Sequence, residues 1–344
     1  MKIEINKLVR ENVLKLKPYS SARDEFEGEA SVFLDANENP YPTDYNRYPD
    51  PHQKQLKKRI SEIKNVSDDQ IFLGNGSDEA IDLLFRAFCE PGKDEVLIPQ
   101  PTYGMYAVSA SINDVRINSV SLTKDFDLDV ATTLEAVTPQ TKIIFLCSPN
   151  NPSGNLLAKE RVIEVIKNFT GLVVVDEAYI DFTESQSLSS LLSQHNNLLI
   201  LQTLSKAWGL AGLRLGICFA STEIISILNK IKPPYNISSV TQSIALARLQ
   251  QVKIKDQQVK EIVDQRKIVA IKLTDSKIVE RIYPSASNFL LVRVKNARKV
   301  YDNLLTKGIV LRDRSNVILC DDCLRITIGT PNENQILIDE LKNL

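Results

Sequence analysis

The sequence predicts an α/β fold with a large domain, built on a mostly parallel central sheet flanked by helices, and a smaller α+β domain. Three observations support this prediction. The chain has 344 residues, enough for a sizeable core and more than one domain. Short apolar runs alternate with helical patterns from residue 71 to residue 220. Beyond Pro233 and Pro234 the pattern changes to long helical stretches and then to a short mixed unit.

The N-terminal segment has apolar residues at helical spacing. These residues are Ile5, Leu8, Val9, Val13 and Leu16, and the pattern stops at Pro18. We therefore predict an amphipathic helix, and we assign residues 1–34 to an N-terminal helix and arm. From residue 35 to 51 the chain is rich in Asn, Pro and Tyr without apolar periodicity, which predicts a long irregular loop with a functional role.

Six strands are predicted in the large domain, which we place at residues 35–233. They are the apolar runs 96–98, 115–120, 142–147, 172–175, 198–201 and 217–220. The small domain, residues 234–344, is expected to contain helices within 238–273 and 297–307 and a terminal helix. Its strands are expected at 288–294, 309–312 and 324–328.

Composition excludes several classes of partner. The 42 basic and 43 acidic side chains give a net charge of −1, so no basic surface for nucleic acid or an anionic membrane is expected. No apolar run approaches the roughly 18 residues that span a bilayer, and the first residues do not resemble a signal peptide. We expect a cytoplasmic protein whose partners are small molecules or a second copy of itself.

The cysteines and histidines offer little chemistry. The five cysteines are odd in number and mostly lie beside apolar residues, so buried thiols are expected rather than disulfides. Cys320 and Cys323 have the spacing of a metal knuckle, but no second pair completes a site, and no metal is expected. His52 and His195 stand alone in polar surroundings and are expected on the solvated surface. A general base must therefore be another residue type.

One lysine stands between a strand-like run and a loop of small residues. Lys206 follows Ser205 and precedes Arg214 by eight positions. A lysine amine forms a Schiff base with the aldehyde of pyridoxal 5′-phosphate, while a hydroxyl and a guanidinium can share the phosphate. An arbitrary lysine faces water, but these neighbours favour a cofactor site.

Four further segments lie at strand or helix ends, where ligands bind in open sheets. The segment 74–79 opens a helix and can hold a phosphate, and Asp176 ends a buried strand, where it can pair with a protonated pyridine nitrogen. Asn151 can donate to a phenolic ring oxygen, and Tyr103 can stack on a ring. Taken singly, each has an ordinary explanation as a turn, a loop start or a core aromatic. Together they converge on one cofactor.

The chain resembles the fold type I pyridoxal-phosphate-dependent transferases, and specifically the histidinol-phosphate aminotransferase family of class II aminotransferases, along nearly its whole length. The matching segments are 18–23, 34–41, 46–50, 86–94, 101–106 and 323–330. The resemblance implies a homodimer with shared active sites. It also implies amino transfer between L-glutamate or 2-oxoglutarate and imidazole acetol phosphate or L-histidinol phosphate, a step of histidine biosynthesis.

The resemblance further implies residue roles. Lys206 would be the Schiff-base lysine, Asp176 would pair with the pyridine nitrogen, and Asn151 and Tyr179 would lie at the ring oxygen. The other cofactor contacts would come from Tyr103 at the ring, from Gly76, Ser77, Asp78, Ser205 and Arg214 at the phosphate, and from Tyr48 of the second subunit. The substrate's carboxylate or phosphate would be held by Arg325, helped by Arg312 and Tyr19.

Three alternatives stay open. Aromatic-amino-acid or aspartate-type aminotransferases share the residues Lys206, Asp176 and Arg214 and differ in the acceptor pocket. Phosphothreonine decarboxylases use the same fold to cleave a different bond. Transcription regulators that bind pyridoxal phosphate carry this domain fused to a helix-turn-helix module, for which the residues before Asp35 are too few and the charge too balanced.

Overall fold

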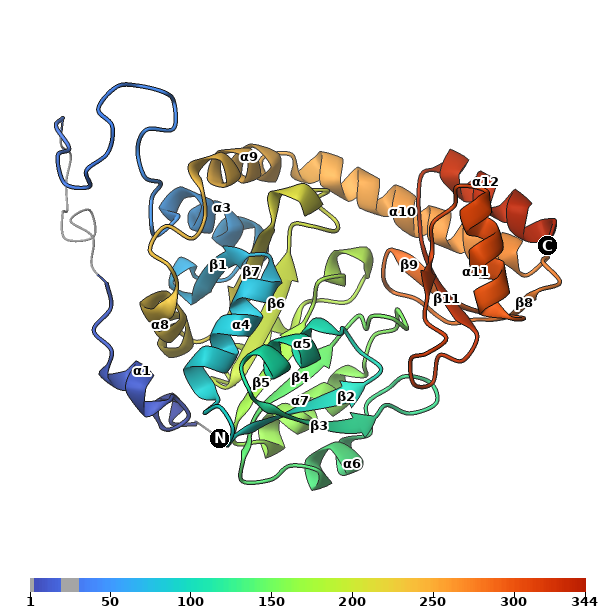
Figure 1. The fold of residues 1–344 in the computed structure, drawn as a ribbon, viewed down its shortest axis with the longest axis horizontal. Coiled ribbons are helices and arrows are strands. Elements are labelled where there is room, and N and C mark those ends of the chain that lie inside the picture. Colours follow the sequence, from blue (N-terminus) through green and yellow to red (C-terminus); the bar gives the residue numbers. More distant parts are fainter. Residues whose placement is uncertain (1–2, 20–30) are drawn as a thin grey trace.

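Two β-sheets organise the computed structural model, which describes residues 3–19 and 31–344 (Figure 1). The first sheet has seven strands in the order β1-β7-β6-β5-β4-β2-β3. They are β1 (Ile71–Asn75), β2 (Glu95–Gln100), β3 (Arg116–Ser121), β4 (Thr141–Cys147), β5 (Leu172–Asp176), β6 (Leu198–Thr203) and β7 (Leu215–Phe219). Strand β7 runs antiparallel to both neighbours, and the other pairs are parallel. The mostly parallel sheet and its six predicted strands are confirmed. The sequence does not predict β1, whose apolar run is only three residues long.

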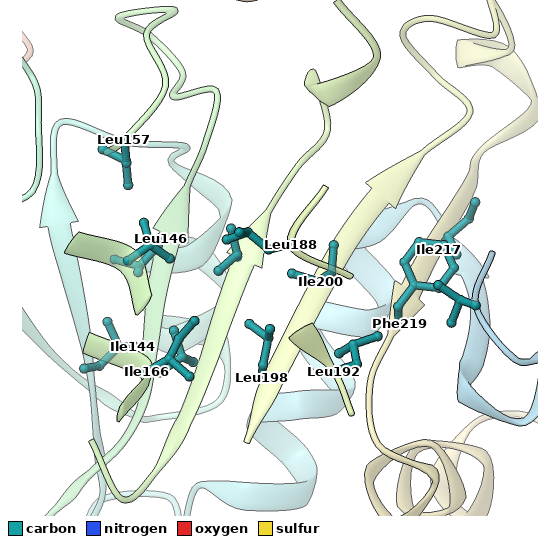
Figure 2. Packing of buried hydrophobic residues seen from close by; sticks show 14 of the residues in the cluster. Ile144, Leu146, Leu157, Ile166, Leu188, Leu192, Leu198, Ile200, Ile217 and Phe219 are labelled. Atoms are coloured by element: carbon teal, nitrogen blue, oxygen red, sulfur yellow. The ribbon is translucent and has the colours of Figure 1, made fainter. Parts of the chain in front are cut away.

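The central strands of this sheet are buried on both faces. In β4, Ile144 and Leu146 belong to one core, while Ile143 and Phe145 belong to the other. Figure 2 shows Ile144 and Leu146 of β4 and Leu198 and Ile200 of β6 on the same face of the sheet, in the first of these cores. Because alternate residues point to opposite faces, burial on both sides requires a continuous apolar run, which is the pattern in the sequence.

Helices cover both faces. One face packs against α4 (Ser77–Phe88), α5 (Met105–Ile112) and α8 (Thr222–Ile231), and the other against α3 (Lys54–Lys64), α6 (Val130–Glu135), α7 (Lys159–Asn168) and α9 (Ser239–Leu249). In a sheet covered by helices on both faces, ligands bind at the carboxyl ends of the parallel strands.

The second sheet has four antiparallel strands in the order β10-β11-β9-β8. They are β8 (Val279–Ile282), β9 (Phe289–Val294), β10 (Arg312–Asp313) and β11 (Cys323–Thr327). Its apolar face packs against α10 (Val252–Leu273), α11 (Ala297–Thr306) and α12 (Pro331–Lys342). The long helix α10 leads from α9 to this unit (Figure 1). The division of the chain at residue 233 stays a prediction, because α9 shares the core of the first sheet.

The predicted N-terminal helix is wrong as a continuous element. The chain forms a short 3-10 helix, η1 (Ile5–Lys7), and the helix α1 (Glu11–Lys15). Between them Arg10 is extended: its N–H donates to Ala87 O at 2.9 Å and its Nε donates to Glu90 at 3.1 Å. The apolar periodicity of this segment therefore reflects burial against α4 and does not indicate one unbroken helix.

The predicted strand at 309–312 is also wrong over most of its length. Gly308 has φ +75°, and the N–H of Ile309 donates to Leu304 O at 2.9 Å, which closes the end of α11. Pairing with β11 begins only at Arg312. The irregular loop at 35–51 is confirmed.

His195 is buried at 8% exposure, so its predicted surface position is wrong, whereas that of His52 is confirmed. His195 lies just before β6, where its N–H donates to Leu191 O, and burial lowers its pKa. All five cysteines are buried free thiols, as predicted. Within residues 3–19 and 31–344, no helix combines the length and apolarity needed to cross a bilayer, and no three potential metal ligands cluster.

Candidate active site

A pocket opens at the carboxyl ends of β4, β5 and β6, beside the N-terminus of α4. It is lined by Gly76, Ser77, Asp78, Tyr103, Cys147, Asn151, Asp176, Ala178, Tyr179, Thr203, Ser205, Lys206 and Arg214. Every predicted cofactor residue except Tyr48 is in this set. Segments that are up to 138 positions apart, from Gly76 to Arg214, thus meet at the sheet edge where parallel strands place their ligands.

Lys206 lies in the loop that follows β6. The loop is fixed by its backbone, because Leu204 N–H donates to Leu215 O and Leu210 N–H donates to Leu204 O, both at 3.0 Å. The Lys206 amine lies 5.6 Å from the centroid of the Tyr179 ring. Partial removal from water lowers the pKa of Lys206, and the charge of Arg325 lowers it further. A lowered pKa makes the neutral, nucleophilic amine available closer to neutral pH.

Asp176 ends β5 and is 3% exposed. Its Oδ1 accepts from Ala178 N–H at 3.0 Å, and its Oδ2 accepts from the Tyr106 hydroxyl at 2.7 Å. Burial raises the pKa of Asp176, and these two hydrogen bonds oppose that rise because they stabilise the ionised form. The pocket floor therefore presents a buried carboxylate with a donor at each oxygen.

The opposite end of the pocket is built to hold an anion. Gly76 caps α4 with φ +73°, a conformation that suits glycine, and a Cβ there would meet Arg214 Nη2 at 2.8 Å. Gly216 brings its strand so close that a Cβ would lie 2.1 Å from Ser77 N. The N–H groups at the start of this 12-residue helix, the Ser205 hydroxyl and the Arg214 guanidinium together suit a phosphate. Arg214 Nη2 also lies 3.4 Å from Asp78 Oδ2.

Aromatic and amide groups form the walls. The Tyr103 hydroxyl donates to Asp78 Oδ1 at 3.2 Å, and burial raises the pKa of Tyr103 well above its usual range. Tyr179 is buried, and its ring packs edge-on against Phe289. Burial also raises the pKa of Tyr179. Both phenols therefore stay neutral donors at ordinary pH. Asn151 is 6% exposed, and its Oδ1 accepts from Arg325.

Arg325 brings the second sheet to this pocket. Its Nη1 donates to Asn151 Oδ1 at 2.6 Å, and its guanidinium carbon lies 5.3 Å from the centroid of the Phe289 ring. Arg312 is the direct partner of Arg325 across the antiparallel β10–β11 pair, so the two side chains share one face. Burial and the positive charge of Arg312 both lower the pKa of Arg325. This face of the β10–β11 pair therefore carries positive charge and suits an anionic substrate.

Sequence reasoning missed Arg314. Its Nε is buried without a hydrogen-bond partner among the described residues, and burial together with the charges of Arg325 and Arg312 lowers its pKa. The signal was available in the alternation Arg312-Asp313-Arg314, because residues two apart on a strand share a face.

Tyr19 and Tyr48 do not join the pocket within this chain. Tyr19 is 72% exposed. Tyr48 is 50% exposed, its ring stacks on Tyr235 at 4.4 Å, and its N–H donates to Glu38 Oε1 at 2.6 Å. Of the arm motif at 18–23, residues 20–23 lie outside the described residues.

Comparison with known proteins gives consistent results. Residues 31–341 match the family described as aminotransferase class I and II. The histidinol-phosphate aminotransferases of Parabacteroides distasonis and Cytophaga hutchinsonii are 55% and 54% identical, and each alignment covers 99% of both chains. The solved histidinol-phosphate aminotransferase of Sinorhizobium meliloti, in complex with pyridoxal-5′-phosphate, superposes with a TM-score of 0.81 at 26% identity. That superposition covers 90% of this chain and 89% of the other.

Proposed function

The chain belongs to the class I and II aminotransferases, in the histidinol-phosphate aminotransferase family, and we propose how its own residues carry out that reaction. It is a pyridoxal-phosphate-dependent enzyme that moves an amino group between L-glutamate and imidazole acetol phosphate, giving 2-oxoglutarate and L-histidinol phosphate in L-histidine biosynthesis. The observation that carries the residue assignment is that Lys206 and Asp176 line one pocket and that Arg325 donates a hydrogen bond to Asn151 in its wall.

The pocket residues fit pyridoxal phosphate. The close approach at Gly76 leaves no room for a side chain at the anion end, and the opposite end holds the buried Asp176 carboxylate. The amine of Lys206 lines the space between these ends. When bound, the cofactor supplies a ring that accepts electrons from the substrate Cα. The phosphate would be held by Gly76, Ser77, Asp78, Ser205 and Arg214, and the ring by Tyr103, Asn151, Asp176 and Tyr179.

Lys206 has two proposed tasks. Its amine would hold the cofactor covalently in the resting enzyme, and once freed it would take the proton from the donor's Cα. Its lowered pKa suits the second task, because at a given pH more of the amine is then unprotonated and able to accept the proton. Asp176 would supply a negative charge at the ring nitrogen, and the neutral Tyr179 hydroxyl would donate to the ring oxygen.

Arg325 is proposed to hold the α-carboxylate of glutamate and, in the other half-reaction, the phosphate of histidinol phosphate. A planar guanidinium can bind two oxygens of either anion. Its hydrogen bond to Asn151 orients one edge of the guanidinium and links substrate recognition to a cofactor-binding residue. Arg312, from the same face, and Arg314 add positive charge that favours the more highly charged phosphate. Tyr19 is proposed to complete this site from the arm.

We further propose that the enzyme works in the cytoplasm as a homodimer, with Tyr48 of one copy reaching the phosphate end of the other copy's pocket. Half-exposed Tyr48, its stacked neighbour Tyr235 and the exposed Val240 and Ile244 of α9 support a contact surface in this region. We also retain the large domain at 35–233 and the small domain at 234–344 as proposed units.

The test is the substrate range of the purified wild-type enzyme. Single-turnover spectra of the bound cofactor should show reaction with L-glutamate and with histidinol phosphate. Histidinol should react far less efficiently, because the alcohol leaves the arginines without an anion. Equal efficiency with histidinol would indicate a broader aromatic aminotransferase. Release of CO2 from threonine phosphate would instead indicate a decarboxylase.

A further inference from the structure

Behind the pocket, one buried phenol has no part in the assignments above. Tyr106 in α5 is 0% exposed, and its hydroxyl donates to Asp176 Oδ2 at 2.7 Å. Its ring stacks on Phe145 with centroids 4.8 Å apart and an interplanar angle of 14°, and it meets the Tyr103 ring edge-on at 5.5 Å. Tyr106 does not line the pocket, and its hydroxyl is linked to the pocket by the hydrogen bond to Asp176.

The carboxylate needs such a partner. A carboxylate that is 3% exposed has lost most of its hydration, and burial is the largest cause of its raised pKa. Among the residues that the structure describes, the Ala178 N–H and the Tyr106 hydroxyl donate to its oxygens, one to each. Both stabilise the ionised form, and each oxygen keeps further acceptor capacity toward the pocket.

The chemical nature of the donor matters. A lysine or arginine at this place would neutralise Asp176 and compete with a protonated ring nitrogen for its charge. A phenol donates a hydrogen bond without adding positive charge. Burial and the Asp176 charge also hold the pKa of Tyr106 well above its usual range, so the phenol keeps its proton over the whole working pH range.

We propose that Tyr106 is a positioning residue that keeps Asp176 ionised and directed at the pocket, and thereby keeps a charged partner for the protonated ring nitrogen of bound pyridoxal phosphate down to a lower pH than Asp176 could alone. The proposal rests on the role proposed above for Asp176. Through this hydrogen bond, the packing of α5 against the first sheet would affect the electronic state of the cofactor.

The test is the variant Tyr106→Phe, which keeps the ring and its stacking on Phe145. Loss of a donor to the charged form raises the pKa of Asp176 further, so Asp176 loses its charge at a higher pH. We expect holoenzyme that binds pyridoxal phosphate at alkaline pH. In a pH titration of enzyme loaded with ¹⁵N-labelled cofactor, the ring-nitrogen chemical shift should report the protonation of Asp176, which removes the nitrogen's charged partner. The midpoint of this acid transition should move up by about one to two pH units, the size of one hydrogen bond to a charged group. Cofactor retention during dialysis should fail over the same shifted range.

Three further variants separate the possible outcomes. Tyr283→Phe removes a hydroxyl from another buried ring, 4% exposed, and should leave the midpoint unchanged. Asp176→Asn should abolish ring-nitrogen protonation, and adding Tyr106→Phe to it should change nothing more. If Asp176→Asn left the nitrogen protonated, the proposed role of Asp176 itself would be wrong. If Asp176→Asn acted as expected but Tyr106→Phe titrated like wild type, only the inference about Tyr106 would be overturned.

A second measurement covers the case in which Tyr106→Phe does not fold. Site-specific 3-fluorotyrosine and 3,5-difluorotyrosine at position 106 keep the hydroxyl and nearly the same shape while making it a progressively stronger donor. The acid midpoint should then fall in that order, a change that packing alone would not produce. Identical midpoints for tyrosine and both analogues would overturn the proposal.

Discussion

The carboxyl edge of the first sheet and the β10–β11 pair of the second sheet build opposite sides of the active site in different ways. On the first side, Asp176 is 3% exposed and has a donor on each oxygen, and the loop carrying Lys206 is pinned by backbone hydrogen bonds. On the second side, Arg312 is exposed, and the partly buried Arg325 reaches the first side through one hydrogen bond to Asn151.

This difference corresponds to the two tasks of the enzyme. The bond-breaking step is the same in both half-reactions, so the residues proposed to perform it can be held rigidly by the core of the sheet. The substrate anion changes from a carboxylate to a phosphate, so the residues that bind it must accept two shapes. Arginines on a short strand pair at the edge of the second sheet meet that need.

The most severe way to break the first side is Lys206→Ala. This change removes both the covalent anchor and the proposed base, so turnover with glutamate should fall by at least the roughly 10²–10⁴-fold typical of positioned proton transfer. The visible absorption of lysine-bound cofactor should disappear, while the phosphate contacts of Arg214 and α4 retain some cofactor noncovalently. An unchanged lysine-bound spectrum in the purified variant would refute the assignment.

On the second side, Arg325→Gln should have the next largest effect on activity. Loss of a charge-assisted, two-oxygen contact should cost about 2–5 kcal/mol, roughly 30- to several thousand-fold, in kcat/KM for both half-reactions. Because the Arg325 charge helps to lower the pKa of Lys206, its removal should raise that pKa. At a given pH less Lys206 is then neutral, so the acid limb of cofactor capture should move to higher pH. Stopped-flow capture across a pH series measures this shift.

Arg312→Gln is the companion variant, because it removes the neighbouring charge but leaves Arg325 in place. It should impair reaction with histidinol phosphate more than reaction with glutamate, since Arg312 is proposed to assist mainly the phosphate. Equal losses in the two half-reactions would show that Arg312 does not distinguish the two anions.

The same contrast explains what could be predicted from the sequence. Strands β4, β5 and β6 are buried on both faces, so their continuous apolar runs, and the polar residues that follow them, can be recognised in the sequence. The pocket brings those polar residues together. The break at Arg10 depends on Ala87 and Glu90, which lie far along the chain. The hydrogen bond of Tyr106 to Asp176 is likewise set by tertiary packing. Local patterns carry no information about such contacts.

The smallest expected effect concerns Tyr48, which belongs to a third region. Within one chain, Tyr48 reaches neither side of the active site. If Tyr48 serves the second copy's pocket, Tyr48→Phe should lose one hydrogen bond to a charged group. This loss should cost about 1.5–3 kcal/mol, or roughly 10- to 150-fold in kcat/KM.

Mixing this variant with Lys206→Ala should restore activity, because each mixed dimer would contain one pocket with both native residues. That dimer should reach up to about half of wild-type activity, as one of two symmetric sites is intact. Size-exclusion chromatography of differently tagged chains should first verify subunit exchange. Once exchange is verified, activity no greater than the sum of the two homodimers would place the action of Tyr48 within its own chain.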